Sequence, residues 1–345
     1  MIKLNSLSYK NALMLTIIST VSANLLLILS NPAIAQNNIG EYPVLDLHNG
    51  EKIEMTVDGQ TVTAFAAPGM PSNLNISNAL AQSIYGKGAN KFASTFERIL
   101  AALAKDEFDN APPRYIQSAI GPVKIRGQQR PAKISLGGRT YNEFVQWFQT
   151  DIHKFGEALA GPYAIPAPVI RFTLRSARPG EARFSMPLMA DDERKVASTR
   201  MVFGKKKVYF AFSPHFETTL ASAAAGAAIA QNNGGEFVGD PKPVVVAFNV
   251  ARPARPVQLK TPITFGPIAL SKLLVRSRDY GDTSAIKEAK LAGASEGDEI
   301  LVQAKRKGTS PEYFVYVGND VLKNCSSITY DKPRQTMTLS CLPSN

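Results

Sequence analysis

Alternating apolar and polar positions along the chain predict paired β-strands. Residues 52–57 and 61–66 both alternate, and the Asp58-Gly59 pair between them is a strong signal for a tight hairpin turn. A second hairpin of the same kind is predicted over residues 199–212, where two such runs meet at Gly204. A similar strand pair is therefore expected in each half of the chain.

Helical spacing of apolar residues predicts several helices beside these strands. Ser77 is a suitable N-cap for a short helix, and a longer alanine-rich helix is predicted over residues 220–231. Two stripes of large apolar residues also recur at helical spacing, and we expect them to face the core. Their members are Phe92, Phe96, Ile99, Leu100 and Leu103 in the first stripe, and Phe144, Phe148, Ile152 and Phe155 in the second.

A sharp loop follows each hairpin, and the two loops are the centre of an internal repeat. Aligning Pro68 with Pro214 also aligns Leu74 with Leu220 without a gap. A repeat with one copy in each half of the chain indicates two related lobes, whereas a solenoid would need many short units. The alternative is a chance similarity between two strand–turn–helix segments.

Composition and length agree with a globular chain of two lobes. The 345 residues are 44% apolar and 19% charged, and roughly 100–200 residues per domain predict two domains. The predicted fold is mainly β with inserted helices, with an N-terminal lobe at residues 36–172 and a C-terminal lobe at residues 173–345. The three His and two Cys are not at metal-ligand spacing, which argues against a zinc or iron–sulfur enzyme. No metal or other cofactor is expected.

Residues 1–35 have the organisation of a signal peptide. Lys3 and Lys10 form a basic start, residues 12–29 are largely apolar, and Ala33-Ile34-Ala35 is a small-x-small cleavage pattern. We expect cleavage, with the mature protein exported to the periplasm or outside the cell. An uncleaved membrane anchor is the alternative, which the polar residues within the apolar run weaken.

The two cysteines flank a predicted C-terminal hairpin. Two strand-like runs, residues 326–330 and 335–340, are joined by the turn-forming residues 331–334. Folding of this hairpin would bring Cys325 and Cys341 together, so an exported chain is expected to form a disulfide between them. Two free buried thiols are the alternative.

Several segments resemble the retropepsin-like aspartyl proteases, the bilobal pepsin–retropepsin type of acid protease. Residues 59–66 are similar to the strand that leads into the first catalytic loop of that family, and residues 70–74 are similar to the segment after it. Residues 316–322 and 328–331 resemble the strand, glycine, short helix and hairpin that close such a lobe. The resemblance implies two homologous six-stranded-type lobes with a cleft between them.

The catalytic motif of that family is degenerate at both places where the resemblance puts it. Each lobe of the family carries an Asp-Thr/Ser-Gly loop, and the two carboxylates share one proton and activate water. This chain has Ala67-Pro68-Gly69 in the first loop and Ser213-Pro214-His215 in the second, with Gly318 as the glycine that closes the second lobe. The resemblance therefore implies an inactive pseudoprotease that binds an extended peptide or an envelope protein.

Two other catalytic arrangements remain open. An active peptidase would need a carboxylate pair elsewhere in the chain. The acids nearest to predicted strand ends are Asp46, Asp191, Asp192 and Asp279. Alternatively, Ser213 and His215 would act as nucleophile and base, although no third residue that would orient the base is evident.

The formal net charge of +11 allows an acidic partner without identifying one. Basic runs at residues 204–207 and 305–307 support a third hypothesis, a structural envelope protein that contacts an anionic envelope surface. Nucleic acid is not expected, since these runs have no interleaved aromatic residues. The sequence assigns no oligomeric state.

Overall fold

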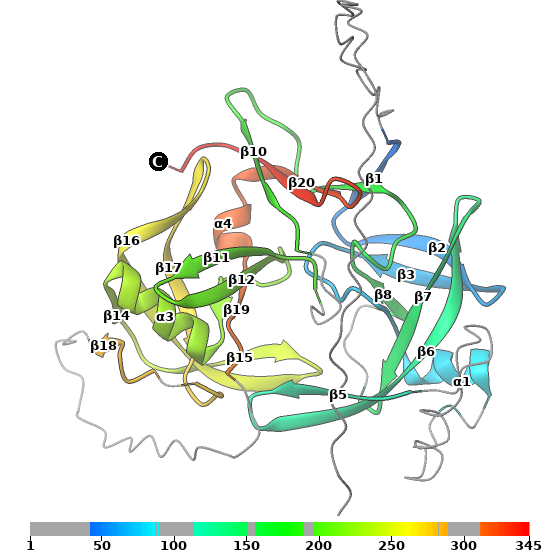
Figure 1. Ribbon diagram of the computed structural model, residues 1–345, viewed down its shortest axis with the longest axis horizontal. Helices are drawn as coiled ribbons and strands as arrows, with labels where there is room; N and C mark the ends of the chain where they lie inside the picture. Colours follow the sequence, from blue (N-terminus) through cyan, green and yellow to red (C-terminus); the bar gives the residue numbers. More distant parts are fainter. Residues whose placement is uncertain are drawn as a thin grey trace, which may run out of the picture. The chain divides into compact units, whose positions relative to one another are not determined.

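The computed structural model describes residues 42–86, 89, 114–150, 156–189, 196–281, 283–288 and 311–344. Over these residues the fold is mainly β, with strands in three sheets and a few short helices (Figure 1). This confirms the predicted fold class. The signal peptide predicted at residues 1–35 and the apolar stripe predicted at residues 92–103 lie outside the described residues.

The N-terminal sheet contains seven strands in the order β2-β3-β8-β4-β7-β6-β5, with an additional pairing of β2 with β6. Its strands are β2 (Glu51–Val57), β3 (Gln60–Ala66), β4 (Leu74–Ile76), β5 (Arg114–Ile120), β6 (Val123–Leu136), β7 (Arg139–Phe148) and β8 (Ala158–Ala160). The Asp58-Gly59 turn joins β2 to β3 in an antiparallel pair, as predicted. Helix α1 (Asn78–Tyr85) follows its predicted N-cap Ser77, whose Oγ accepts the backbone N–H of Leu80 at 3.1 Å.

The C-terminal sheet contains nine strands in the order β11-β12-β19-β13-β17-β16-β14-β18, with β15 paired to β16. Its strands are β11 (Thr199–Phe203), β12 (Lys206–Phe212), β13 (Leu220–Ala221), β14 (Gly235–Phe237), β15 (Lys242–Ala247), β16 (Val250–Phe265), β17 (Ile268–Arg276), β18 (Lys287–Glu288) and β19 (Phe314–Val317). Helix α3 (Ala223–Asn233) packs closely on this sheet, since a Cβ added to Gly226 would lie 2.4 Å from Val275. Its small residues permit that approach. Helix α4 (Asn319–Leu322) follows β19.

A third sheet of five strands combines segments that are distant in the chain. The strand order is β1-β9-β20-β21-β10. The strands are β1 (Val44–His48), β9 (Val169–Thr173), β10 (Ala182–Pro187), β20 (Cys325–Asp331) and β21 (Thr336–Cys341). The antiparallel pair β20–β21 confirms the predicted C-terminal hairpin. Strand β9 spans the lobe boundary predicted at residues 172 and 173, and that boundary stays a prediction.

Strand pairing is repeated between the N-terminal and C-terminal sheets. Strand β3 pairs in parallel with β8, β8 pairs antiparallel with β4, and β4 pairs in parallel with β7. Strands β12, β19, β13 and β17 make the same three pairings in the same order. Strand β4 begins at Leu74 and β13 begins at Leu220, the two residues that the sequence alignment places together. The repeat predicted from the sequence is therefore present in the topology.

The structure corrects two of the helix predictions. Phe144 and Phe148 lie in β7, which pairs with β6 along its whole length, whereas Ile152 and Phe155 lie outside the described residues. Cross-strand pairing overrides the helical spacing of these aromatic side chains, which also suit a half-buried strand. The alanine-rich helix begins later than predicted, because residues 220–221 pair with β17 as strand β13.

Most buried apolar side chains form one continuous core that includes residues of all three sheets. Its largest fully buried members include Trp147 in β7, Phe172 in β9 and Phe212 in β12. In the part of the chain that the structure describes, no helix combines the length and the hydropathy that a membrane span requires.

Candidate functional site

The loops that follow β3 and β12 carry the residues that the sequence identifies as degenerate catalytic positions. The backbone N–H of Ala67 donates to the carbonyl oxygen of Ala160, the last residue of β8, at 3.2 Å. The backbone N–H of Ser213 donates to the carbonyl oxygen of Val317, the last residue of β19, at 2.9 Å. Since β8 and β19 are equivalent in the repeated pairing, Ala67 and Ser213 occupy equivalent positions.

A glycine lies in close backbone contact with each of these loops. Gly161 follows β8, and a Cβ at this residue would lie 2.3 Å from the carbonyl oxygens of both Met70 and Pro71. Gly318 follows β19, and a Cβ there would lie 2.8 Å from the carbonyl oxygen of Phe216. Only a residue without a side chain allows the backbones to approach so closely. The glycine predicted at position 318 therefore has a counterpart in Gly161, which the sequence analysis did not single out.

Asp320 joins the second loop to helix α4. Its Oδ1 atom accepts hydrogen bonds from the backbone N–H of Thr219 at 3.0 Å, the hydroxyl of Thr219 at 2.9 Å and the backbone N–H of Val321 at 3.1 Å. The Thr219 hydroxyl oxygen in turn accepts the backbone N–H of Gly318 at 3.0 Å. These bonds hold the end of the loop against the start of the helix. No sequence pattern predicted these bonds; the only local signal is that Asp320 is an acid in the first turn of α4, where a negative charge is favourable.

The two loops lie against each other. Gly69 has a φ of +75°, and a Cβ there would lie 2.4 Å from the Cβ of Ser213 and 2.9 Å from the carbonyl oxygen of Phe212. The rings of Phe65 and His215 pack at a centroid distance of 5.3 Å and an angle of 52°. The structure therefore brings the Ala67-Pro68-Gly69 loop and the Ser213-Pro214-His215 loop into contact.

The contact between the two loops carries neutral side chains. Ala67 and Ser213 have 0% and 1% of their surface exposed. Ala67 belongs to an apolar cluster with Met70 and Leu159. Burial lowers the pKa of His215, so its imidazole is neutral at pH 7. Within the two tripeptide loops, no side chain is charged at neutral pH.

The aspartates considered as alternative catalytic carboxylates make other contacts. Asp46 is in β1 and pairs with Arg171 on an exposed surface, and the hydrogen bond from Arg171 lowers the pKa of Asp46. The carboxylate of Asp279 lies 2.7 Å from the guanidinium of Arg276, and both side chains are buried. Asp191 and Asp192 lie outside the described residues.

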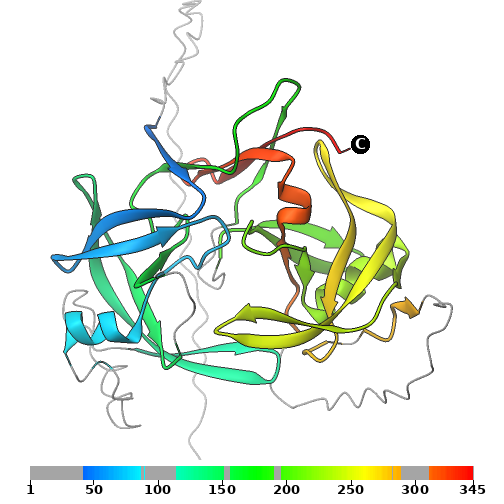
Figure 2. The same ribbon diagram turned by 180° about the vertical axis from the view of Figure 1, so that it is seen from behind.

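The β5–β6 and β15–β16 hairpins converge from the two sheets, and apolar residues of both pack in one cluster (Figure 2). Ile120 at the β5–β6 turn, Phe148 at the end of β7 and Phe248 at the β15–β16 turn are buried in this cluster. The rings of Phe148 and Phe248 meet edge to face at 4.7 Å. Phe248 has a φ of +53°, which is strained for a bulky residue, and its burial against Phe148 offsets that cost. No sequence pattern predicted this contact.

The turn at Gly121 makes a second contact with the C-terminal half. Gly121 has a φ of +57°, and a Cβ there would lie 2.6 Å from Oδ1 of Asp279 and 3.3 Å from Nε of Arg252. The guanidinium of Arg276 also lies 3.1 Å from the carboxylate of Glu312. A turn of the N-terminal sheet thus sits directly on a buried ion pair of the C-terminal half.

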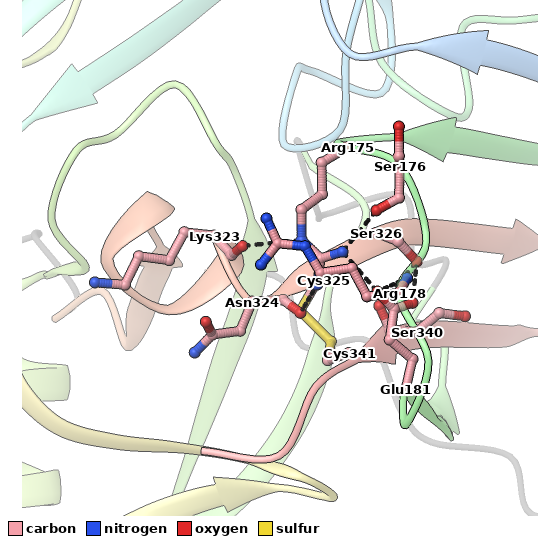
Figure 3. Close-up of polar contacts among 10 residues, drawn as sticks. All are labelled: Arg175, Ser176, Arg178, Glu181, Lys323, Asn324, Cys325, Ser326, Ser340 and Cys341. Atoms are coloured by element: carbon pink, nitrogen blue, oxygen red, sulfur yellow. Dashed lines mark hydrogen bonds and ion pairs between the residues drawn. A yellow bond between two sulfur atoms is a disulfide. The ribbon is translucent and has the colours of Figure 1, made fainter. Parts of the chain in front are cut away.

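The disulfide predicted between Cys325 and Cys341 is present (Figure 3). Beside it lies Arg175, in the segment after β9. The Arg175 guanidinium donates to the carbonyl oxygens of Lys323 and Asn324, the two residues before Cys325. The segment between β9 and β10 is therefore held to the end of α4, next to the disulfide.

Glu181 completes this network and was not predicted from the sequence. Its carboxylate accepts from Arg175 at 2.6 Å, from the backbone N–H of Arg178 at 3.0 Å and from the hydroxyl of Ser326. Burial alone would raise the pKa of Glu181, but the hydrogen bonds from Ser326 and Arg175 outweigh it and lower the pKa. The carboxylate is therefore ionised at neutral pH, and both of its oxygens accept hydrogen bonds.

The basic run at residues 204–207 is exposed: residues 204–205 form the turn between β11 and β12, and Lys206 and Lys207 begin β12. The amine of Lys206 lies 5.4 Å from the ring centroid of Tyr313. The second basic run, at residues 305–307, lies outside the described residues. Among the residues that the structure describes, no group of three or more His, Cys, Asp or Glu side chains is placed to hold a metal ion.

Comparison with known proteins adds little to this geometry. No known protein family and no curated protein matches the sequence. Among solved structures, the EIAV protease complexed with the inhibitor HBY-793 matches with 12% identity and a TM-score of 0.19, over 36% of this chain and 85% of that chain. This similarity is distant, so the functional conclusions rest on the repeated strand pairing and the geometry of the two loops.

Proposed function

We propose that this protein is a catalytically inactive, aspartyl-protease-like protein that binds an extended peptide beside its two facing loops. The observation that carries the proposal is the placement of Ala67 and Ser213 at equivalent positions of loops that contact each other. An aspartyl protease requires two carboxylates at such positions, one of them ionised to activate water. A methyl group and a hydroxyl group cannot share a proton in this way, so the positions support binding without hydrolysis.

The proposed peptide lies in an extended conformation between the facing loops and the two converging hairpins. Strands β5 and β15 are each paired with only one neighbour among the described strands. The backbone N–H and C=O groups on their other edges are suited to strand addition, which binds a peptide mainly through its own backbone. This recognition favours an extended, flexible peptide over a folded partner.

We further propose that the protein is exported and that residues 1–35 are removed. The disulfide supports this proposal, because disulfides form and persist in oxidising compartments outside the cytosol. Sequencing the N-terminus of the protein recovered from the producing cell is expected to show a start at Gln36. A protein that retains residues 1–35 in a membrane fraction would contradict cleavage.

Hydrolysis and binding are to be measured on the same preparation. We expect no cleavage of casein or of a library of ten-residue peptides between pH 3 and pH 8. Cleavage that a pepstatin-type inhibitor abolishes would contradict the proposal and support the active peptidase with a carboxylate pair elsewhere. Binding is to be followed by the anisotropy of the same peptides carrying a fluorescent label.

The bound region is to be mapped by hydrogen exchange. We expect added peptide to protect the backbone amides of residues 213–219 and of the β15 edge, and to leave the β20–β21 hairpin unchanged as an internal control. Saturable binding without protection at these segments would place the peptide elsewhere and contradict the proposed site. Binding only to anionic vesicles, lost on raising the salt concentration, would instead favour the structural envelope protein.

A further inference from the structure

A pocket of about 550 Å³ lies on the N-terminal sheet, and none of its lining residues belongs to the two facing loops. It is formed where the β2–β3 turn, the end of helix α1 and the middle of β6 meet. Its volume is in the range of roughly 300–1,000 Å³ that small-molecule sites occupy. The proposed peptide site does not include this pocket.

Arg130 and Tyr85 line the pocket, and Tyr85 stacks on Trp147 behind it. The guanidinium of Arg130 lies over the ring of Tyr85 at 4.8 Å, and Tyr85 stacks on Trp147 at 5.4 Å with an angle of 26°. Trp147 is 2% exposed, and its indole N–H donates to the carbonyl oxygen of Ala89 at 3.0 Å. The stack is therefore anchored in the core. The N–H donors of a guanidinium lie in its own plane, so a guanidinium held over a ring can still direct donors to a ligand.

The carboxylate in the pocket, that of Asp58, is already hydrogen-bonded within the protein. Oδ1 of Asp58 accepts the backbone N–H of Lys133 at 2.8 Å, and Oδ2 accepts the hydroxyl of Tyr85 at 3.2 Å. Burial and the negative charge of Asp58 both raise the pKa of Tyr85, so the phenol stays protonated and continues to donate. Asp58 thus serves to hold the β2–β3 turn against β6 and α1.

The guanidinium of Arg130 is not engaged in this way. Within the described part of the chain it has the ring contact with Tyr85 and no hydrogen-bonded or ion-paired acceptor. Arg130 and Lys133 bring two positive charges to the pocket against the one negative charge of Asp58. The five N–H donors of a guanidinium match the two oxygens of a carboxylate or phosphate.

We propose that this pocket binds a small organic anion, with a carboxylate or phosphate group on the donor edge of Arg130. The apolar part of the anion lies against Ile84 and Pro131, which also line the pocket. The side chain of Lys133 adds a second positive charge beside the bound oxyanion. The site is separate from the facing loops, and its ligand is independent of the proposed peptide.

The experiment uses benzoate, phenyl phosphate and inorganic phosphate as probes of the full chain, with binding measured by calorimetry. Wild-type protein is expected to bind at least one probe saturably, with one site per chain. Arg130→Gln is expected to weaken that binding by about tenfold or more, as the loss of a charged hydrogen-bond pair predicts. Arg130→Lys keeps the charge but loses the paired donors, so its affinity is expected to lie between those of wild type and Arg130→Gln.

Arg114→Gln is the matched control. Arg114 also lies over an aromatic ring, that of Phe144 at 5.9 Å, but it does not line the pocket. Its substitution is expected to leave binding within about twofold of wild type. Thermal unfolding of each variant shows that loss of binding is not loss of fold.

The three probes also identify the anion. Binding of benzoate alone assigns a carboxylate, binding of inorganic phosphate and phenyl phosphate alone assigns a phosphate, and binding of both aromatic probes but not inorganic phosphate shows that the apolar wall is needed. The proposal is overturned if wild-type protein binds none of the probes saturably, or if Arg130→Gln and Arg114→Gln bind them equally.

Discussion

Substitution of Glu181 by Gln tests whether the network beside the disulfide stabilises the fold. The substitution keeps the size of the side chain and removes its charge. Glu181 and Arg175 have only 9% and 18% of their side chains exposed, and the carboxylate accepts three hydrogen bonds. Breaking a buried ion pair by neutralising one partner costs roughly 3–5 kcal/mol.

The expected loss for Glu181→Gln is smaller than that range. Arg175 also donates to the carbonyl oxygens of Ser176, Lys323 and Asn324, so its charge is not left without acceptors. A glutamine amide also retains one acceptor oxygen for the donors around it. We therefore expect Glu181→Gln to lower the free energy of unfolding by about 2–3 kcal/mol at pH 7, measured by urea unfolding with the disulfide intact.

Asp46→Asn is the control, because it also removes one carboxylate of an Arg–Asp pair. The Asp46 and Arg171 side chains are 56% and 43% exposed, and pairs at such positions contribute about 0–1 kcal/mol. An equal loss in the two variants would refute the argument that burial makes the Glu181 network important.

The pH dependence of the same variants gives a second check. The folded-state pKa of Glu181 is lowered from the ordinary value of 4.5, so its contribution is fully present above that value. It is lost as the pH falls through the lowered folded-state pKa. The difference in free energy of unfolding between wild type and Glu181→Gln is therefore expected to be constant above about pH 5.5 and to shrink below pH 4.5. A difference that grows on acidification would contradict the sign of the shift.

Three further predictions concern the packing of the fold. Removing the disulfide with Cys325→Ala and Cys341→Ala is expected to lower the urea midpoint by an amount equivalent to about 3 kcal/mol, since the bond closes a loop of 16 residues; an unchanged midpoint would contradict this. Gly161→Ala is expected to cost about 1–3 kcal/mol, because its Cβ would lie 2.3 Å from two carbonyl oxygens. Gly239→Ala, whose Cβ would meet a side-chain atom at 3.4 Å, is its near-neutral control. A double-mutant cycle of Phe148→Leu and Phe248→Leu is expected to give a coupling energy of about 0.5–1.5 kcal/mol, whereas simple additivity would show that the two rings do not stabilise each other.

The features predicted from the sequence are those that depend on neighbouring residues. The Asp58-Gly59 turn, the Ser77 N-cap and the disulfide hairpin all follow from local chemistry, and the structure has each of them. The repeated loops were also found, because alignment compares two local patterns. Helical spacing failed at Phe144 and Phe148 because pairing with β6 decides the structure there.

The features missed by sequence reasoning join residues that are far apart in the chain. Arg175 contacts carbonyl groups 148 and 149 residues away, and no periodicity reports such a contact. The pocket was missed for the same reason, because Asp58, Tyr85 and Arg130 come from three different parts of the chain. The close contact of Gly161 with Met70 and Pro71 likewise depends on the fold. Only the assembled sheets show why these residue types stand at these positions.

The absence of carboxylates from the facing loops also has a consequence for stability, which Ala67→Asp tests. Ala67 is fully buried in an apolar cluster with Met70 and Leu159. Burial without a charged partner would raise the pKa of an aspartate at this position, and its ionised form would destabilise the folded state. We expect a loss of about 3–5 kcal/mol in the free energy of unfolding at pH 7. The loss should decrease as the pH falls toward about 3.9, the value for an unfolded aspartate, because the neutral acid is buried more easily. Ala67→Asn has the same size without the charge, so its loss should be smaller and independent of pH. If the two variants lose the same stability at pH 7, the apolar surroundings of Ala67 do not penalise a carboxylate, and the reasoning from the burial of this residue is wrong.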